Sequence, residues 1–291
     1  MIRTRTGSLI LHLMPILIPF AALFMTGIII TVLQSFGIGF ALPEGTGFLS
    51  AYREVFQSPF FLASVRHSLW IGLVSASVSV MTGMFLALLI WNTTSRVKKY
   101  SVVYKIPLIL PHITVAFIVI IIFSQSGLLA SLAYQAGLLS EPADFPNLFY
   151  NKTGTGIILS YIWKEVPFAT LMVLSVLQKL DIRYIQTGTM LGAGFFRKFR
   201  HLILPHIAPA VHTTFIILFL YSFGAFDIPF LVGESSPRML SITVFNLYFR
   251  AQLSSRPQAM AILTMMFLFS MIFITLYTRA VTAVNPKARR I

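Results

Sequence analysis

The chain has 291 residues, of which 57% are hydrophobic and only 10% are charged. Soluble domains carry about 25% charged residues, so this composition excludes an ordinary soluble domain and predicts an all-α protein that crosses a membrane several times. The absence of cysteine excludes a disulfide framework and a thiolate metal site. The net charge of +14 leaves nucleic-acid binding open until the positions of the cations are considered.

A helix needs roughly 20 apolar residues to cross the hydrocarbon core of a bilayer. Six stretches meet this requirement, at about 9–33, 63–91, 102–123, 155–177, 208–231 and 257–280. We therefore predict a single transmembrane domain of six helices over residues 1–291.

The first stretch is expected to be broken by Pro15 and Pro19. Its apolar run is longer than the 7–15 residues typical of a signal peptide and no A-x-A site follows, which favours an uncleaved anchor. Residues 51–58 form a short amphipathic piece before the second span, and residues 124–153 are expected to form a longer loop.

The cations are distributed unevenly over the segments between the spans. Six spans place both termini, the 2–3 connection and the 4–5 connection on one side, which holds most of the 22 Lys and Arg residues. These are Arg3, Arg5, Arg96, Lys98, Lys99, Lys105, Lys179, Arg183, Arg197, Lys198, Arg200, Arg279, Lys287, Arg289 and Arg290. Excess Lys and Arg marks the cytoplasmic side, so both termini are expected there, and the net charge indicates topology rather than a nucleic-acid partner.

The 4–5 connection, residues 178–209, is the most polar segment between two spans, and we call it the coupling segment. Glycines 188, 192 and 194 interrupt two short amphipathic pieces, and Pro205 and Pro209 are expected to close the segment. Its cations could hold a solvated loop on anionic headgroups. Its apolar residues favour instead a face that is buried against a soluble partner. These residues are Ile182, Ile185, Met190, Leu191, Phe195, Phe196 and Phe199.

The spacing within the coupling segment resembles a loop of the binding-protein-dependent ABC importer permeases. That loop reads EAA, three residues, Gly, nine residues, Ile, any residue and Leu-Pro. Gly192 stands at the Gly, Leu202 at the Ile, and Leu204 and Pro205 at the Leu-Pro, without a gap. Gln186, Thr187 and Gly188 replace EAA, so the acidic first position is lost.

The resemblance implies a type I ABC importer permease fold in a bacterial inner membrane. Two identical or homologous permeases would form the pathway, a cytoplasmic ABC ATPase dimer would hold ATP and Mg²⁺, and a periplasmic or lipid-anchored binding protein would deliver the solute. No cofactor is expected on this chain. The implied ATPase-docking residues are Gln186, Thr187, Gly188, Gly192, Ala193, Phe199, Leu202, Leu204 and Pro205.

Two details resemble the spermidine/putrescine-type permeases. One is Leu191-Gly192-Ala193, and the other is the pattern of Phe226, Pro229, Leu231 and Gly233. The resemblance implies a polyamine or a related small ion or phosphonate as the solute.

No enzyme is expected from the motifs. The P-loop GxxxxGK[ST], the metalloprotease HExxH and the esterase GxSxG are absent from the sequence, and no histidine pairs with a carboxylate at ligand spacing. The ATP hydrolysis that drives an ABC importer would belong to a separate subunit.

Ionisable residues inside membrane spans are costly and so point to function by default. Lys164 and Glu165 lie in the fourth span, where they could line a solute path, pair with each other, or pack helices near a break at Pro167. Asp227 lies late in the fifth span, where it could attract a cation to a vestibule or be solvated near the interface.

Pro107 and Pro111 predict that the third span is broken at membrane depth, either beside a cavity or as a packing kink. An ion-coupled secondary transporter, with Glu165 and Asp227 as proton relays, is the main rival to the importer. Two observations argue against this rival: no inverted repeat is evident in the sequence, and six spans would be only half the size of such a transporter. A membrane scaffold that holds a partner without transport is a third reading.

Overall fold

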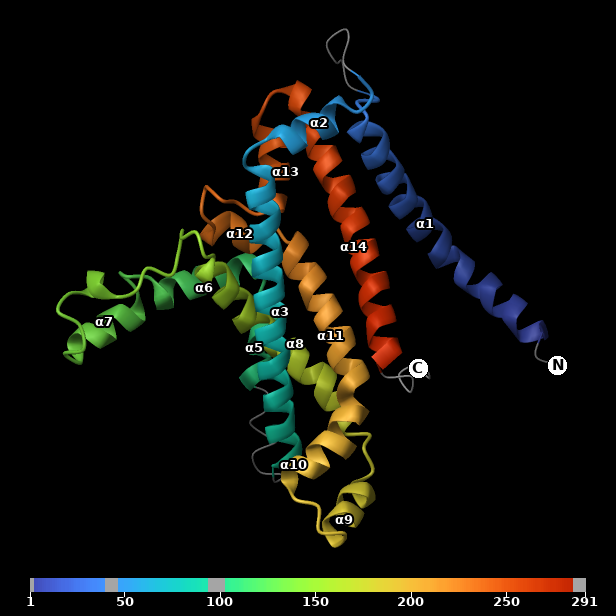
Figure 1. Cartoon of the computed structure of the whole chain (residues 1–291), viewed down its shortest axis with the longest axis vertical. Coiled ribbons are helices and arrows are strands. Elements are labelled where there is room, and N and C mark those ends of the chain that lie inside the picture. Colours follow the sequence, from blue (N-terminus) through green and yellow to red (C-terminus); the bar gives the residue numbers. More distant parts are fainter. Residues whose placement is uncertain (1–2, 40–46, 94–102, 285–291) are drawn as a thin grey trace. The chain divides into compact units, whose positions relative to one another are not determined.

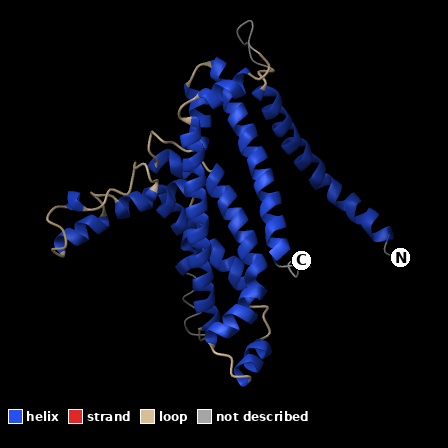
Figure 2. Ribbon diagram, viewed as in Figure 1, coloured by secondary structure: helices blue, strands red, loops and turns tan. Residues whose placement is uncertain are grey.

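The computed structural model describes residues 3–39, 47–93 and 103–284, with side chains from residue 12 to residue 283. All regular structure within these ranges is helical, as Figure 2 shows. The predicted basic turn with Arg96, Lys98 and Lys99, and the tail with Lys287, Arg289 and Arg290, lie outside the described residues.

Six helical stretches of the described chain are long and apolar enough to cross a membrane, which confirms the predicted architecture. They are His12–Ser35, Phe61–Asn92, His112–Gln135, Thr155–Leu177, Phe195–Gly224 and Leu253–Ala283. Figure 1 labels the main helices. The longer ones are α1 (Arg3–Ser35), α3 (Phe61–Asn92), α6 (His112–Phe123), α8 (Thr155–Leu177), α11 (Leu204–Gly224) and α14 (Arg256–Val284).

The connections also contain helices. These are α2 (Ser50–Gln57), α5 (Ile106–Ile109), α7 (Leu128–Gln135), α9 (Ile182–Met190), α10 (Phe195–Lys198), α12 (Asp227–Val232) and α13 (Leu240–Phe245). π-helical turns occupy Phe199–Ile203 and Asn246–Arg250, and 3₁₀ turns occupy Pro142–Asp144 and Leu253–Ser255. The amphipathic piece predicted at 51–58 is thus α2, whereas the loop expected at 124–153 contains α7.

Several prolines predicted to break helices lie inside them instead. Pro15 and Pro19 are within α1, Pro167 is within α8, and Pro209 is within α11. Helices that cross membranes tolerate proline because neighbouring groups satisfy the freed carbonyls. The expectations that Pro15 and Pro19 break the first span, and that Pro209 closes the coupling segment, were therefore wrong.

True breaks occur at two other places. The third span is interrupted at Leu110 and Pro111, both with extended ψ angles, and the long helix restarts at His112. This confirms the break predicted from Pro107 and Pro111, while the predicted start at Val102 lies outside the described residues. The fifth span ends at Gly224, so Asp227 lies in the first turn of the separate helix α12 rather than late in the span.

The chain forms two compact units, of which the first comprises residues 1–61 and 243–269. In it, α2 buries Ala51 and Val55. The hydroxyls of Ser35 and Tyr52 are 2.7 Å apart, and the Gln258 amide donates to the Glu54 carboxylate over 2.5 Å. These polar contacts tie α2 to the end of α1 and to the start of α14.

The second unit comprises residues 62–242 and 270–291, and α8 packs against α5, α6, α11 and α12 at its centre. One core cluster joins α3, α6, α8 and α12 around Ile71, Val115, Ile157 and Ile228. A second cluster lies toward the coupling segment and joins Ala87 of α3, Leu177 of α8 and Ile203 and Ile207 of the fifth span.

Small residues let the central helices of the second unit approach closely. A Cβ added at Gly83 would lie 2.5 Å from the Ala169 Cβ and 2.9 Å from the Thr170 backbone nitrogen. A Cβ at Gly72 would lie 3.3 Å from the Phe219 ring. Close contact at small residues drives helix association where lipid removes the hydrophobic driving force.

Candidate functional site

Two helical ends give the coupling segment a defined shape. The Asp181 carboxylate caps α9 by accepting a hydrogen bond from the Arg183 backbone N–H over 2.9 Å. At the other end, Gly192 has a left-handed φ of +73°. The Gly192 and Ala193 N–H groups donate to the Thr189 and Gly188 carbonyls, which is the Schellman pattern that glycine favours at a helix end.

The two halves of the coupling segment are packed against each other. A Cβ at Gly188 would lie 3.2 Å from Leu202 Cδ1, so the third residue of the Gln186-Thr187-Gly188 triplet faces the π-helical turn. Lys198 Nζ donates to Thr189 Oγ1 over 2.9 Å. The structure thus brings together Gly188 and Leu202, two of the residues that the spaced motif singles out.

The apolar residues of the segment divide into an outward and an inward group. Met190 is 87% exposed and Leu191 80% exposed, and we call these two residues the apolar tip. Phe195 and Phe196 are also largely exposed. Ile185 and Phe199 are half-buried against the second core cluster, so they attach the segment to the helices.

The remaining motif residues also occupy different environments. Leu202 is half-buried beside Gly188, and Leu204 is half-buried against the second core cluster. Gln186, Thr187 and Pro205 are exposed, and Ala193 is half-buried. The exposed surface open to a partner is therefore formed chiefly by the apolar tip and its neighbours rather than by Leu202 and Leu204.

Lys164 is buried in α8 and binds the interrupted third span. Its ammonium donates to the carbonyls of Pro107 at 2.7 Å, Leu108 at 3.2 Å and Leu110 at 2.5 Å. Those carbonyls lie around the end of α5, where no further helical turn supplies N–H donors. All three donors of the ammonium are thus used by backbone at the break, so Lys164 does not pair with Glu165.

Glu165 projects from the same helix toward α11. Its Oε1 accepts a hydrogen bond from the Ser222 hydroxyl, and Oε2 has no hydrogen-bond partner among the residues that the structure describes; the side chain is 3% exposed. The buried hydroxyls of Ser75, Ser79 and Tyr161 also lack a partner. The partner Ser222 was not among the residues that the sequence singled out, because nothing in its local pattern indicates a carboxylate 57 residues away.

Asp227 is exposed and lies near two aromatic side chains. It is within electrostatic range of His112 and Tyr221, whose ring centroids are 4.9 Å apart. Both rings are half-buried, so this group presents hydrogen-bonding atoms at the surface of the second unit. Of the three candidate solute-path residues, Asp227 alone is open to solvent.

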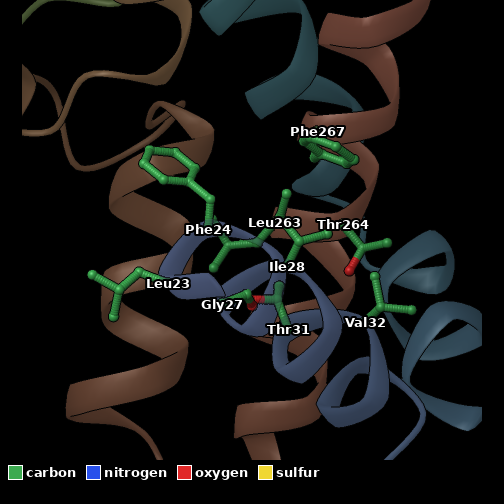
Figure 3. Close-up of a pocket in the computed structure, with 9 residues that line it drawn as sticks. All are labelled: Leu23, Phe24, Gly27, Ile28, Thr31, Val32, Leu263, Thr264 and Phe267. Carbon is green, nitrogen blue, oxygen red and sulfur yellow. The ribbon is translucent and has the colours of Figure 1, made fainter. Parts of the chain in front are cut away.

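An apolar cavity of about 430 Å³ lies between α1 and α14 within the first unit (Figure 3). The polar side chains in it are those of Thr31 and Thr264. Their hydroxyls donate to carbonyls of their own helices, at Gly27 over 2.8 Å and at Met260 over 2.9 Å. These two residues therefore offer a hydrophilic solute hydroxyl oxygens that can accept, but no free hydrogen-bond donor.

No group of three or more His, Asp or Glu side chains that could hold a metal ion occurs among the residues described. The possible solute-path residues are likewise dispersed: Lys164 faces α5, Glu165 faces α11, and Asp227 belongs to α12.

The family model for the binding-protein-dependent transport system inner membrane component matches residues 79–290. The chain belongs to this family of permeases, and it is a multi-pass inner-membrane protein. The match includes the coupling segment and five of the six membrane helices in part or whole.

Individual relatives are more distant. A probable ABC transporter permease of Pyrococcus horikoshii is 21% identical over 65% of this chain and 65% of its own length. The glycerol-3-phosphate permease UgpA of Yersinia pestis is 26% identical over 60% of this chain and 58% of its own. The xylose/arabinose permease XacH of Haloferax volcanii is 24% identical over 70% of this chain and 66% of its own length. The chain thus spans less than two thirds of the length of the first two of these relatives.

Solved structures show the same fold over nearly the whole chain. A chain of a bacterial alginate importer superposes with a TM-score of 0.78 at 19% identity, covering 99% of this chain and 97% of that one. A chain of the methionine importer MetNI gives a TM-score of 0.56 at 15% identity, covering 77% of this chain and 95% of that one. The predicted type I importer permease fold is confirmed.

Proposed function

We propose that this chain is a permease subunit of an ATP-driven importer, in which the coupling segment docks on a cytoplasmic ABC ATPase. The observation that carries the proposal is the apolar tip, Met190 and Leu191, which is exposed on a capped and internally bonded pair of helices. Two large apolar residues held in water are costly unless a partner covers them. The family membership supports an ATPase as that partner.

The proposed importer would need other subunits besides this chain. A second permease, identical or homologous, would complete the pathway, and a solute-binding protein would deliver the solute from outside. The alginate importer has been solved in complex with a periplasmic protein bound to alginate pentasaccharide, which supports such a partner here. ATP and Mg²⁺ would be held by the ATPase, and this chain would act by rigid-body motion.

The solute is proposed to be a sugar, a sugar phosphate or a related polyol. The named relatives carry glycerol-3-phosphate or xylose and arabinose, and none of those reported above is a polyamine permease. The polyamine expected from Leu191-Gly192-Ala193 and from the pattern around Pro229 therefore receives no support. The ion-coupled transporter is not favoured either, since the family match outweighs two dispersed carboxylates.

The docking role can be tested by charging the apolar tip. Leu191→Asp should abolish co-purification of an ATP-hydrolysing subunit in detergent, because a buried unpaired carboxylate costs several kcal/mol. Leu138→Asp is the matched control, since Leu138 is 77% exposed in the 124–153 connection. It should leave the complex intact.

Two outcomes would contradict the proposal. One is an ATPase that stays bound, with unchanged hydrolysis, in the Leu191→Asp protein. The other is uptake that collapses with a protonophore while cellular ATP is maintained, which would support the ion-coupled reading instead.

A further inference from the structure

A groove of about 520 Å³ separates the last turns of α3 from the coupling segment in the second unit. Leu88 and Trp91 of α3 line one wall, and Ile185, Phe195 and Phe199 line the other. Its polar lining comes from Asn92, Thr93 and Lys198. We propose that this groove binds an anionic phospholipid, with an acyl chain between α3 and the coupling segment and the phosphate beside Lys198.

The apolar walls fit a hydrocarbon chain. The volume lies within the range of about 300–1,000 Å³ typical of small-molecule sites. On α3, Phe85 is 59% exposed and Leu89 49% exposed, so no other part of the chain that the structure describes covers this wall. A polar solute would find few partners along these walls, whereas burial of an acyl chain is favourable along the whole length of the contact.

The position of the groove along the helices fits a lipid at the membrane surface. α3 is long and apolar enough to cross the bilayer, and residues of its last turns line the groove. Trp91 lines it there, and tryptophan is enriched where hydrocarbon meets headgroups. The apolar part of the groove then meets hydrocarbon and its polar end meets the headgroup layer.

The charges at the polar end select an anionic headgroup. Lys198 Nζ uses one of its three donors on Thr189 Oγ1, which leaves two for a phosphate. Arg197 and Arg200 are exposed on either side of it in the sequence. The single acid of the coupling segment, Asp181, is engaged as the cap of α9. Basic pockets beside membrane helices are typical sites for anionic lipids.

Fluorescence of Trp91 can report on the occupant directly. In a Trp70→Phe, Trp163→Phe background, Trp91 is the remaining tryptophan of the sequence. The protein would be placed in nanodiscs that contain phospholipids with brominated acyl chains, which quench tryptophan on contact. At equal mole fractions, brominated phosphatidylglycerol should quench Trp91 at least twice as strongly as brominated phosphatidylcholine.

Substitution of Lys198 should remove this preference. Lys198→Gln should equalise quenching by the two lipids, and Lys198→Arg should retain the preference because the charge is kept. Arg183→Gln is the matched control: Arg183 is an exposed cation of α9 that does not line the groove. It should behave like the parent protein, and all variants should elute from gel filtration as the parent does.

Three results would overturn the proposal. Equal quenching of the parent protein by both lipids would mean that only non-selective boundary lipid is present. A preference that persists in Lys198→Gln would place the headgroup elsewhere. Loss of quenching by both lipids when the ATPase is bound would assign the groove to the ATPase.

Discussion

The burial of Lys164 is explained by the backbone carbonyls that its ammonium binds. An interrupted helix at membrane depth leaves carbonyls without N–H donors, and lipid cannot supply any. The ammonium of Lys164 meets the carbonyls of Pro107, Leu108 and Leu110. The break between α5 and α6 and the lysine in α8 are thus two parts of one arrangement.

We expect Lys164→Met to destabilise the protein. The substitution keeps an unbranched side chain that is one heavy atom shorter, but it leaves buried carbonyls unpaired, at about 1–3 kcal/mol each. The unfolding temperature in detergent should therefore fall by several degrees. Lys152→Met, which removes an exposed lysine, should leave it unchanged. If Lys164→Met instead kept its stability and lost uptake alone, the lysine would act on the solute.

The sequence singled out Lys164 and Glu165 as ionisable residues inside a membrane span, but it did not predict the groups that they bind. A charged pair of neighbours suggested an ion pair, yet successive residues on a helix point about 100° apart. Lys164 therefore reaches α5 and Glu165 reaches Ser222 of α11. These partners lie between 54 and 57 residues away in the chain, beyond any local pattern.

At the scale of the element, the hydrophobic stretches predicted the helices well. The fourth span was predicted at 155–177, and α8 occupies Thr155–Leu177. The ends of the fifth span and the inward or outward direction of the coupling residues were not predictable in the same way. Phe195 and Phe199 are both aromatic, but their exposure depends on how α10 meets the second core cluster.

The α3–α8 contact provides a prediction for helix packing. Gly83→Ala should lower the unfolding temperature, because the new Cβ would lie 2.5 Å from the Ala169 Cβ and must force the helices apart. Overpacking of this kind typically costs about 1–3 kcal/mol. Gly27→Ala in α1 is the control and should not lower the unfolding temperature, because an added Cβ there would meet no other described segment within 4 Å.

A second substitution separates packing from other effects. Gly83→Ala combined with Ala169→Gly should recover part of the lost stability, but not all of it. The recovery is partial because the Thr170 nitrogen would still lie 2.9 Å from the new Cβ. A double variant no more stable than Gly83→Ala would contradict the packing explanation.

At the scale of the whole molecule, the distribution of cations predicts which segments face the cytoplasm, and labelling can test it. The chain has no cysteine, so any introduced cysteine is a unique label site. Tyr184→Cys in α9 and Leu138→Cys are both at exposed positions, with exposed fractions of 64% and 77%. In spheroplasts, a membrane-impermeant maleimide should label the cysteine at 138 and not that at 184.

Inverted membrane vesicles should give the opposite result, since they expose the cytoplasmic side. Labelling of position 184 in spheroplasts would show that the excess of Lys and Arg does not determine the orientation here. The coupling segment could then not meet a cytoplasmic ATPase.

The helix from Phe195 to Gly224 runs without a break from the groove beside the apolar tip to the residues just before Asp227. At 1.5 Å per residue, this continuous rod is about 45 Å long, and proline 209 does not interrupt it. Because a helix resists compression along its axis, we expect a partner that moves the Phe195 end of this helix to move its Tyr221 and Ser222 end as well. Since the Ser222 hydroxyl donates to the Glu165 carboxylate of α8, such a movement would change the buried contact between these two helices.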